Sequence, residues 1–72
     1  MIRFAIGERV RIVGVVPDYH AGRSGVVQAV EYHSPERWIL DQYFVQMDRG
    51  EKVWFWPAQL RVDDSAAVHS AA

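Results

Sequence analysis

Histidines, serines and paired carboxylates are the residues of this chain that are able to do acid–base, nucleophilic or metal chemistry. His20, His33 and His69 are far apart, and none has the spacing at which histidines share a metal. His20 and His33 flank a strand-like segment of about eight residues, which would hold them roughly 25 Å apart. The serines stand in no nucleophile motif, and the adjacent Asp63 and Asp64 fall in a polar C-terminal stretch where carboxylates are usually solvated. We therefore expect no catalytic residue, no cofactor and no metal site.

Aromatic side chains are the remaining candidates, because they bind by burial and stacking rather than by reaction. Residues 51–56 read Glu-Lys-Val-Trp-Phe-Trp. Since side chains alternate along a strand, Trp54 and Trp56 share one face while Val53 and Phe55 share the other. A chain of 72 residues cannot easily bury both faces. One face is therefore core, and the other carries rings in water or against a partner.

The turn before this segment decides which face is core. A two-residue loop at Arg49 and Gly50 would need a positive φ at Arg49, which is unfavourable. A three-residue loop, Asp48–Gly50, needs a left-handed residue only at Gly50, so we favour it. This loop pairs Met47 with Glu51, Val45 with Val53, Phe44 with Trp54 and Tyr43 with Phe55. The predicted core face then carries Tyr43, Val45, Met47, Val53 and Phe55, and the predicted outer face carries Phe44, Gln46, Lys52, Trp54 and Trp56.

Short alternating segments separated by glycine and proline turns predict a small all-β barrel of five strands. The predicted strands are residues 2–16 with a bend at Gly7, 25–32 with a bulge, 38–47 with a kink at 41–42, 51–56, and 60–62. Residues 33–37 are expected to be a loop. Pro57 favours one short helical turn at 57–59, just before the last strand. We expect one domain, residues 1–62, followed by a flexible tail at 63–72.

Composition narrows the class of protein. Half of the residues are hydrophobic, which is enough for a core, and the net charge of −1 lacks the basic excess of a dedicated nucleic-acid binder. Seven of the eight basic residues are arginine, which suits planar and stacked contacts. There is no cysteine, no apolar run of about 20 residues and no signal-peptide pattern at the N-terminus. We expect a cytoplasmic protein without a membrane span.

Three runs resemble bacterial SH3-like barrels. Phe4-x-Ile6-Gly7-Glu8-Arg9-Val10-Arg11-Ile12 looks like their opening strand, and Gly22-x-x-Gly25-x-Val27-x-x-Val30 resembles their KOW segment. Tyr43-x-Val45-x-Met47-Asp48-x-Gly50, followed by Val53-x-Phe55 and Leu60, is similar to their closing hairpin and last strand. Together the runs cover residues 4–62. The resemblance implies a five-stranded SH3-like barrel.

Three relatives within that architecture imply different functions. The electron-transport accessory group includes the ferredoxin-docking subunit of photosystem I, the variable chain of ferredoxin–thioredoxin reductase and the C-terminal domain of the nitrile hydratase β subunit, and it implies a non-catalytic docking barrel. KOW domains imply contact with RNA, DNA or protein. The type II dihydrofolate reductases use a Val-Gln-Ile-Tyr strand where this chain has Val53-Trp54-Phe55-Trp56. Because that glutamine and tyrosine are missing, we do not expect reductase activity.

Our leading hypothesis is a docking or accessory module that binds a protein partner, or a second copy of itself, through exposed aromatic rings. Interfaces favour aromatic and arginine side chains. The expected contact residues are Phe44, Trp54 and Trp56, with Trp38, Tyr19 and His20 on bordering loops. Two alternatives stay open at this stage. Either tryptophan could instead cover an end of the barrel, and the rings with nearby arginines could stack on nucleic acid.

Overall fold

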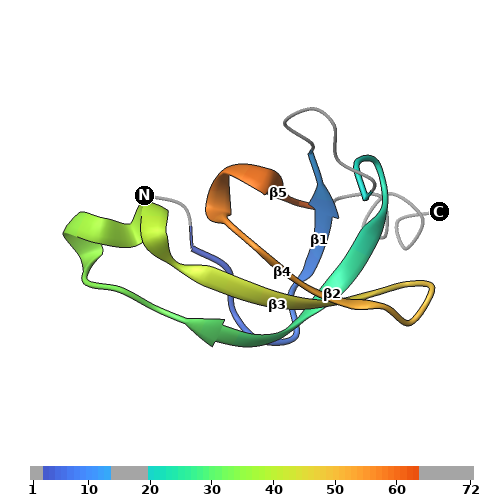
Figure 1. Cartoon of the computed structure of the whole chain (residues 1–72), viewed down its shortest axis with the longest axis horizontal. Coiled ribbons are helices and arrows are strands. Elements are labelled where there is room, and N and C mark those ends of the chain that lie inside the picture. The colour runs from blue at the N-terminus through green and yellow to red at the C-terminus, as the bar shows by residue number, and fades with distance from the viewer. Residues whose placement is uncertain (1–2, 14–19, 64–72) are drawn as a thin grey trace, which may run out of the picture.

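The structure, a computed structural model, describes residues 3–13 and 20–63. These residues form one antiparallel sheet with the strand order β4-β3-β2-β1-β5. Figure 1 shows the long β2–β3 ribbon with one 3-10 segment, η1, at its far end and a second, η2, between β4 and β5. The elements are β1 (Arg9–Ile12), β2 (Ser24–Glu31), η1 (Pro35–Leu40), β3 (Gln42–Met47), β4 (Lys52–Phe55), η2 (Pro57–Gln59) and β5 (Leu60–Val62).

The β3–β4 hairpin has the register predicted from its turn. Tyr43 lies opposite Phe55, and Phe44 lies opposite Trp54. The amide of Gly50 donates to the carbonyl of Met47, and Gly50 has a φ of 101°. The three-residue loop is therefore confirmed, because its left-handed position is filled by the one residue type that adopts it without strain.

Side-chain alternation separates a core face from an outer face across the sheet. The core face holds the buried apolar residues Phe4, Val10, Ile12, Val27, Tyr43, Val45, Met47, Phe55 and Leu60, with Val30 and Val53 packed against them. Gly25 also lies on this face, where a Cβ atom would stand 2.5 Å from the carbonyl oxygen of Gln46. The bulge expected in β2 is confirmed by a register shift between Val27 and Ala29.

Two predicted strands differ from the structure by more than one residue at an end. The first was expected over residues 2–16, of which residue 2 and residues 14–16 lie outside the described residues. Within residues 3–13 the strand β1 is Arg9–Ile12, preceded by a turn at Gly7. The third was expected from Trp38, but Trp38–Leu40 belongs to η1 and β3 begins at Gln42. The amide of Asp41 donates to the carbonyl of Trp38, which closes a 3-10 turn where the strand prediction required extended backbone.

The all-β, five-stranded prediction and the short helical turn before the last strand are confirmed. β4 and β5 are the two ends of the strand order and are not hydrogen-bonded to each other. The sheet is therefore open between β4 and β5, which η2 connects along the chain. No helix in residues 3–13 and 20–63 is long and apolar enough to cross a membrane.

Candidate functional site

The outer face of the hairpin carries an aromatic surface, defined here as Phe44, Trp54 and Trp56. The rings of Phe44 and Trp54 pack against each other across β3 and β4, with centroids 4.9 Å apart and planes tilted by 38°. Trp54 and Trp56 are each 46% exposed, and Phe44 is half-buried. Such cross-strand aromatic pairs hold their rings in fixed positions. The three residues predicted to lie outside are therefore on the outer face, and two of them present large apolar area to solvent.

Polar and small residues surround this aromatic surface. Ala29 of β2 lies opposite Phe44, which extends the apolar strip across a third strand. Lys52 lies opposite Gln46 at one end, and Glu31 lies opposite Gln42 at the other. The surroundings thus contain one acid and one base at opposite ends. An aromatic centre within a nearly neutral polar rim is typical of protein interfaces.

The other predicted contact residues do not join this surface. Trp38 lies in η1 and lines a hollow together with Pro57 and Leu60. The ring of His20 packs edge-on against Phe55, with centroids 5.8 Å apart, and Phe55 points to the core face. Trp38 and His20, which we expected to border the aromatic surface, thus make their described contacts with the hollow and with Phe55. Tyr19 lies outside the described residues.

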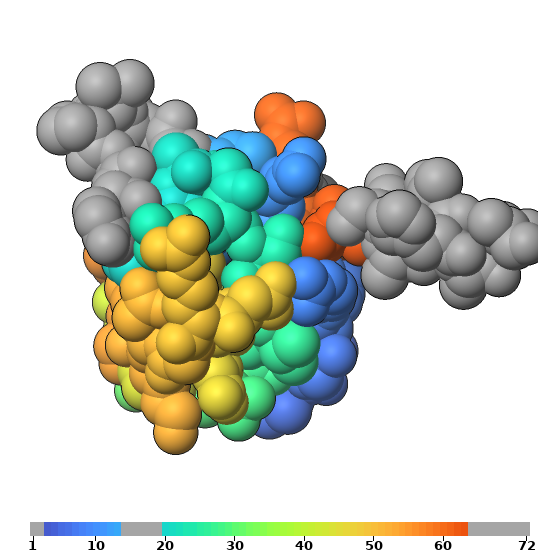
Figure 2. Space-filling view, turned by 90° about the vertical axis from the view of Figure 1, so that its right-hand side faces the viewer, coloured from blue at the N-terminus to red at the C-terminus, as the bar shows by residue number. Residues whose placement is uncertain are grey.

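Arg9 is held by two carboxylates rather than left to bind a ligand. Its guanidinium makes two hydrogen bonds to Asp48, of 3.0 and 2.6 Å, and its Nε lies 3.2 Å from Oδ2 of Asp63. The hydrogen bond to Asp48 raises the pKa of Arg9 above its ordinary value. Figure 2 shows this end of the molecule, where the β3–β4 turn lies against β1 and the start of β2. Asp63, which we expected to begin the tail, is buried beside β1.

A second feature, the edge groove, was not predicted from the sequence. It is a mostly apolar hollow of about 620 Å³ between η1, η2 and β5. Its apolar walls include Phe4, Trp38, Ile39, Pro57, Leu60 and Val62, and Arg61 is its one charged lining residue. Ile39 and Val62 are 61% and 52% exposed. Their meeting was not visible in the sequence, because residues 38–39 and 57–62 are brought together only by the fold.

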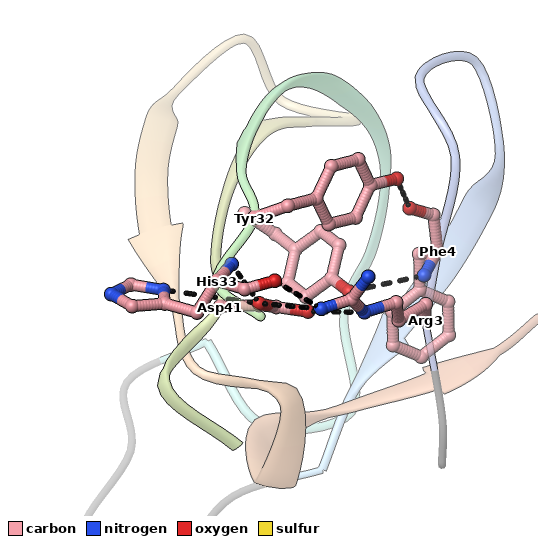
Figure 3. Close-up of polar contacts among 6 residues, drawn as sticks. Arg3, Phe4, Tyr32, His33 and Asp41 are labelled. Carbon is pink, nitrogen blue, oxygen red and sulfur yellow. Dashed lines mark hydrogen bonds and ion pairs between the residues drawn. The ribbon is translucent and has the colours of Figure 1, made fainter. Parts of the chain in front are cut away.

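A buried carboxylate fixes one wall of the edge groove. Asp41 is fully buried, and its Oδ1 accepts a 2.6 Å hydrogen bond from the amide of His33. The Nε of Arg3 lies 3.0 Å from Asp41 Oδ2, and the guanidinium also donates to the carbonyl of His33 and sits over the Tyr32 ring. Figure 3 shows Arg3 between these groups.

The same region ties the N-terminal arm to the core. The amide of Phe4 donates a 3.1 Å hydrogen bond to the hydroxyl of Tyr43, and the hydroxyl of Tyr32 donates to the carbonyl of Phe4. Burial raises the pKa of Tyr43 above its ordinary value. These contacts satisfy backbone groups that would otherwise be buried without partners. They fix Phe4, which lines the edge groove, to β3 and to the segment that follows β2.

The carboxylates beside these features are paired with basic side chains. Within residues 3–13 and 20–63, no group of three or more histidine, aspartate or glutamate side chains is placed to hold a metal ion. The buried Asp41 is engaged by Arg3 and His33, and Asp48 is engaged by Arg9. Comparison of the chain with protein-family models, with curated proteins and with solved structures gave no match.

Proposed function

We propose that this domain is a non-catalytic docking module of the cytoplasm that binds a protein partner through the aromatic surface. The observation that carries the proposal is the packed pair of Phe44 and Trp54, together with the 46% exposure of both Trp54 and Trp56. Large aromatic side chains at the centre of an interface supply most of the binding energy of many complexes. The SH3-like resemblance, to barrels that dock on larger proteins, supports the same function.

The expected partner presents an apolar patch with few charges. Within β2, β3 and β4 the charged residues are Glu31 and Lys52, and they have opposite signs. Two tryptophans at this exposure offer about 200 Å² together, whereas a stable interface buries about 800 Å² on each partner. The aromatic surface is therefore the centre of a larger contact rather than a complete one.

Charge placement favours protein over nucleic acid as the partner. Arg9 is neutralised by Asp48 and Asp63. Arg11 is on β1, three strands from β4, or about 14 Å across the sheet. Lys52 is the one basic residue on β4. Phosphate contacts supply most of the affinity of nucleic-acid binders, and the rings lack a row of such contacts.

The test compares wild type with Trp54→Ala, using Ile6→Ala as the matched control because Ile6 is also apolar and exposed, at 68%. A partner captured from an extract of the source cells is purified and titrated against each variant by calorimetry. Loss of a centre residue costs about 2 kcal/mol or more, so Trp54→Ala should weaken binding about 30-fold. Ile6→Ala should change it by less than about threefold.

Three outcomes would contradict the proposal. One is a captured partner whose affinity is equal for wild type and Trp54→Ala. Another is a sedimentation profile in which wild type is a dimer and Trp54→Ala a monomer, which would make a second copy the occupant. The third is binding of single-stranded RNA or DNA that weakens steeply with salt and is lost in Trp54→Ala, which would make the module a nucleic-acid binder.

A further inference from the structure

The outer edge of β5 carries backbone groups that pair with nothing in the described part of the chain. The amide of Asp63 donates to the carbonyl of Arg9, and the amide of Val13 donates to the carbonyl of Gln59. Because hydrogen-bonded pairs alternate along an antiparallel ladder, Arg61 also bonds to β1 while Leu60 and Val62 point their backbone groups away from it. The amide of Leu60 donates to the carbonyl of Pro57. The carbonyl of Leu60 and both backbone groups of Val62 are left on the open edge.

The edge groove lies beside this open edge. Leu60 and Val62 share one face of β5 by alternation, and both line the groove with Trp38 and Ile39. A strand added to β5 opposite Val62 would direct every second side chain into this hollow. The groove would accept apolar side chains at those positions, because its walls are mostly apolar.

The opposite face of the same two strands carries uncompensated positive charge. Arg11 of β1 lies directly opposite Arg61 of β5, and both are exposed. Like charges in that position destabilise a sheet. Neither arginine has an acidic partner among residues 3–13 and 20–63, since Asp63, on the same face, is paired with Arg9. An acidic side chain on an added strand would lie next to Arg61 and relieve this repulsion.

We propose that β5 binds an extended acidic peptide segment of a partner protein by strand addition. The segment has apolar side chains at alternate positions, which enter the edge groove, and acidic side chains between them, which face Arg61 and Arg11. This surface is separate from the aromatic surface and does not depend on it. The open edge provides backbone hydrogen bonds, the groove selects apolar residues, and the two arginines select charge and register.

The same charges disfavour a second copy of this chain as the occupant. If Leu60 of one copy paired with Val62 of another, Arg61 would lie opposite Arg61 across the new ladder. Four arginines would then be gathered on one face, counting Arg11 of each copy. A charged residue on a short edge strand is a common device against edge-to-edge association. An acidic segment meets no such repulsion.

The test uses synthetic peptides of eight residues in which valine and glutamate alternate. Binding to the full-length domain is followed through the amide resonance of Val62 and the fluorescence of Trp38, which lines the groove. For a peptide lying antiparallel to β5, the valine amides face β5 and the glutamate amides face solvent. One peptide is therefore N-methylated at its valines and another at its glutamates. We expect the first to bind at least about tenfold more weakly than the unmodified peptide and the second to bind equally well. A peptide with lysine in place of glutamate should also bind about tenfold more weakly.

Two protein variants complete the experiment. Val62→Pro removes the outward amide without touching the bonds to β1, as proline is tolerated on an edge strand, and it should lose peptide binding. Val62→Ala keeps the amide and serves as its control. If Val62→Pro does not fold, the two methylated peptides still decide the question. Equal binding of both methylated peptides, no shift of the Val62 amide, or a dimer that protects this amide without peptide would each overturn the proposal.

Discussion

Separating Arg3 from Asp41 should destabilise the domain and loosen the edge groove together. Arg3→Met keeps most of the aliphatic stem and removes the guanidinium. It leaves Asp41, whose side chain is fully buried, with the amide of His33 as its remaining close donor. Asp41 also ends η1 through the hydrogen bond from its amide to the carbonyl of Trp38. A shift of Asp41 would therefore move the segment that carries Trp38 and Ile39.

The expected loss of unfolding free energy follows from the burial of Arg3 and Asp41. Breaking a buried ion pair by removing one member costs about 3–5 kcal/mol. Arg3 retains 26% side-chain exposure, so water screens part of its interaction and the lower part of that range applies. A domain of 72 residues has a free energy of unfolding of about 4 to 11 kcal/mol. Arg3→Met, at about 3 kcal/mol, should remove a large fraction of that stability.

The assay is urea unfolding of wild type, Arg3→Met, Asp41→Asn and the double variant, followed by tryptophan fluorescence and circular dichroism. The double variant buries no unpaired carboxylate, so it should be more stable than the sum of the single losses predicts, with a coupling of about 1–3 kcal/mol. Arg37→Met, which removes an exposed arginine of η1, is the control and should change stability by less than about 0.5 kcal/mol. The reasoning would be refuted if Arg3→Met lost less than about 0.5 kcal/mol of unfolding free energy and the losses of the two single variants summed to that of the double variant.

Three further predictions concern single residues. Gly25→Ala should cost about 1–3 kcal/mol in urea unfolding, because its Cβ would meet the carbonyl oxygen of Gln46 at 2.5 Å and force β2 and β3 apart; a neutral result would contradict this packing. Gly50→Ala should cost about 1–2 kcal/mol because Gly50 has a φ of 101°, although a Cβ there would meet no atom within 4 Å. Asparagine adopts this φ more easily than alanine, so Gly50→Asn should recover part of the loss. Gly25→Asn should recover none, because its Cβ would still meet Gln46. Burial raises the pKa of Tyr43, so its protonated form stabilises the fold fully below about pH 10 and this contribution is lost as pH rises through the raised pKa. Tyr43→Phe should cost about 1–3 kcal/mol at neutral pH, because the amide of Phe4 loses its acceptor, and its stability should decline less steeply above pH 10 than that of wild type; parallel pH profiles would contradict the assignment.

Local sequence was sufficient for the hairpin and for the aromatic surface on it. Gly50 is the one residue of its loop that adopts a positive φ easily, and this fixed the register of β3 against β4. Once the register was set, alternation placed Phe44 and Trp54 outside and Tyr43 and Phe55 inside. Pro57 likewise marked the 3-10 turn before β5. Each of these depends on residues a few positions apart, so neighbouring residue types determine them.

Contacts between distant residues decided the rest. Trp38 lies in η1 rather than in the predicted third strand. Asp41 ends η1 and is buried beside Arg3, which is 38 positions away from it in the chain. Arg9 proved unavailable to a ligand because Asp48, 39 positions away, folds back beside it. The edge groove exists only because η1, η2 and β5 meet around Phe4. The alternation of apolar residues predicts which side of a strand is buried. The curvature of the sheet and the pairing of buried charges decide which strands and loops meet. These depend on residues far apart in the chain, so no single segment predicts them.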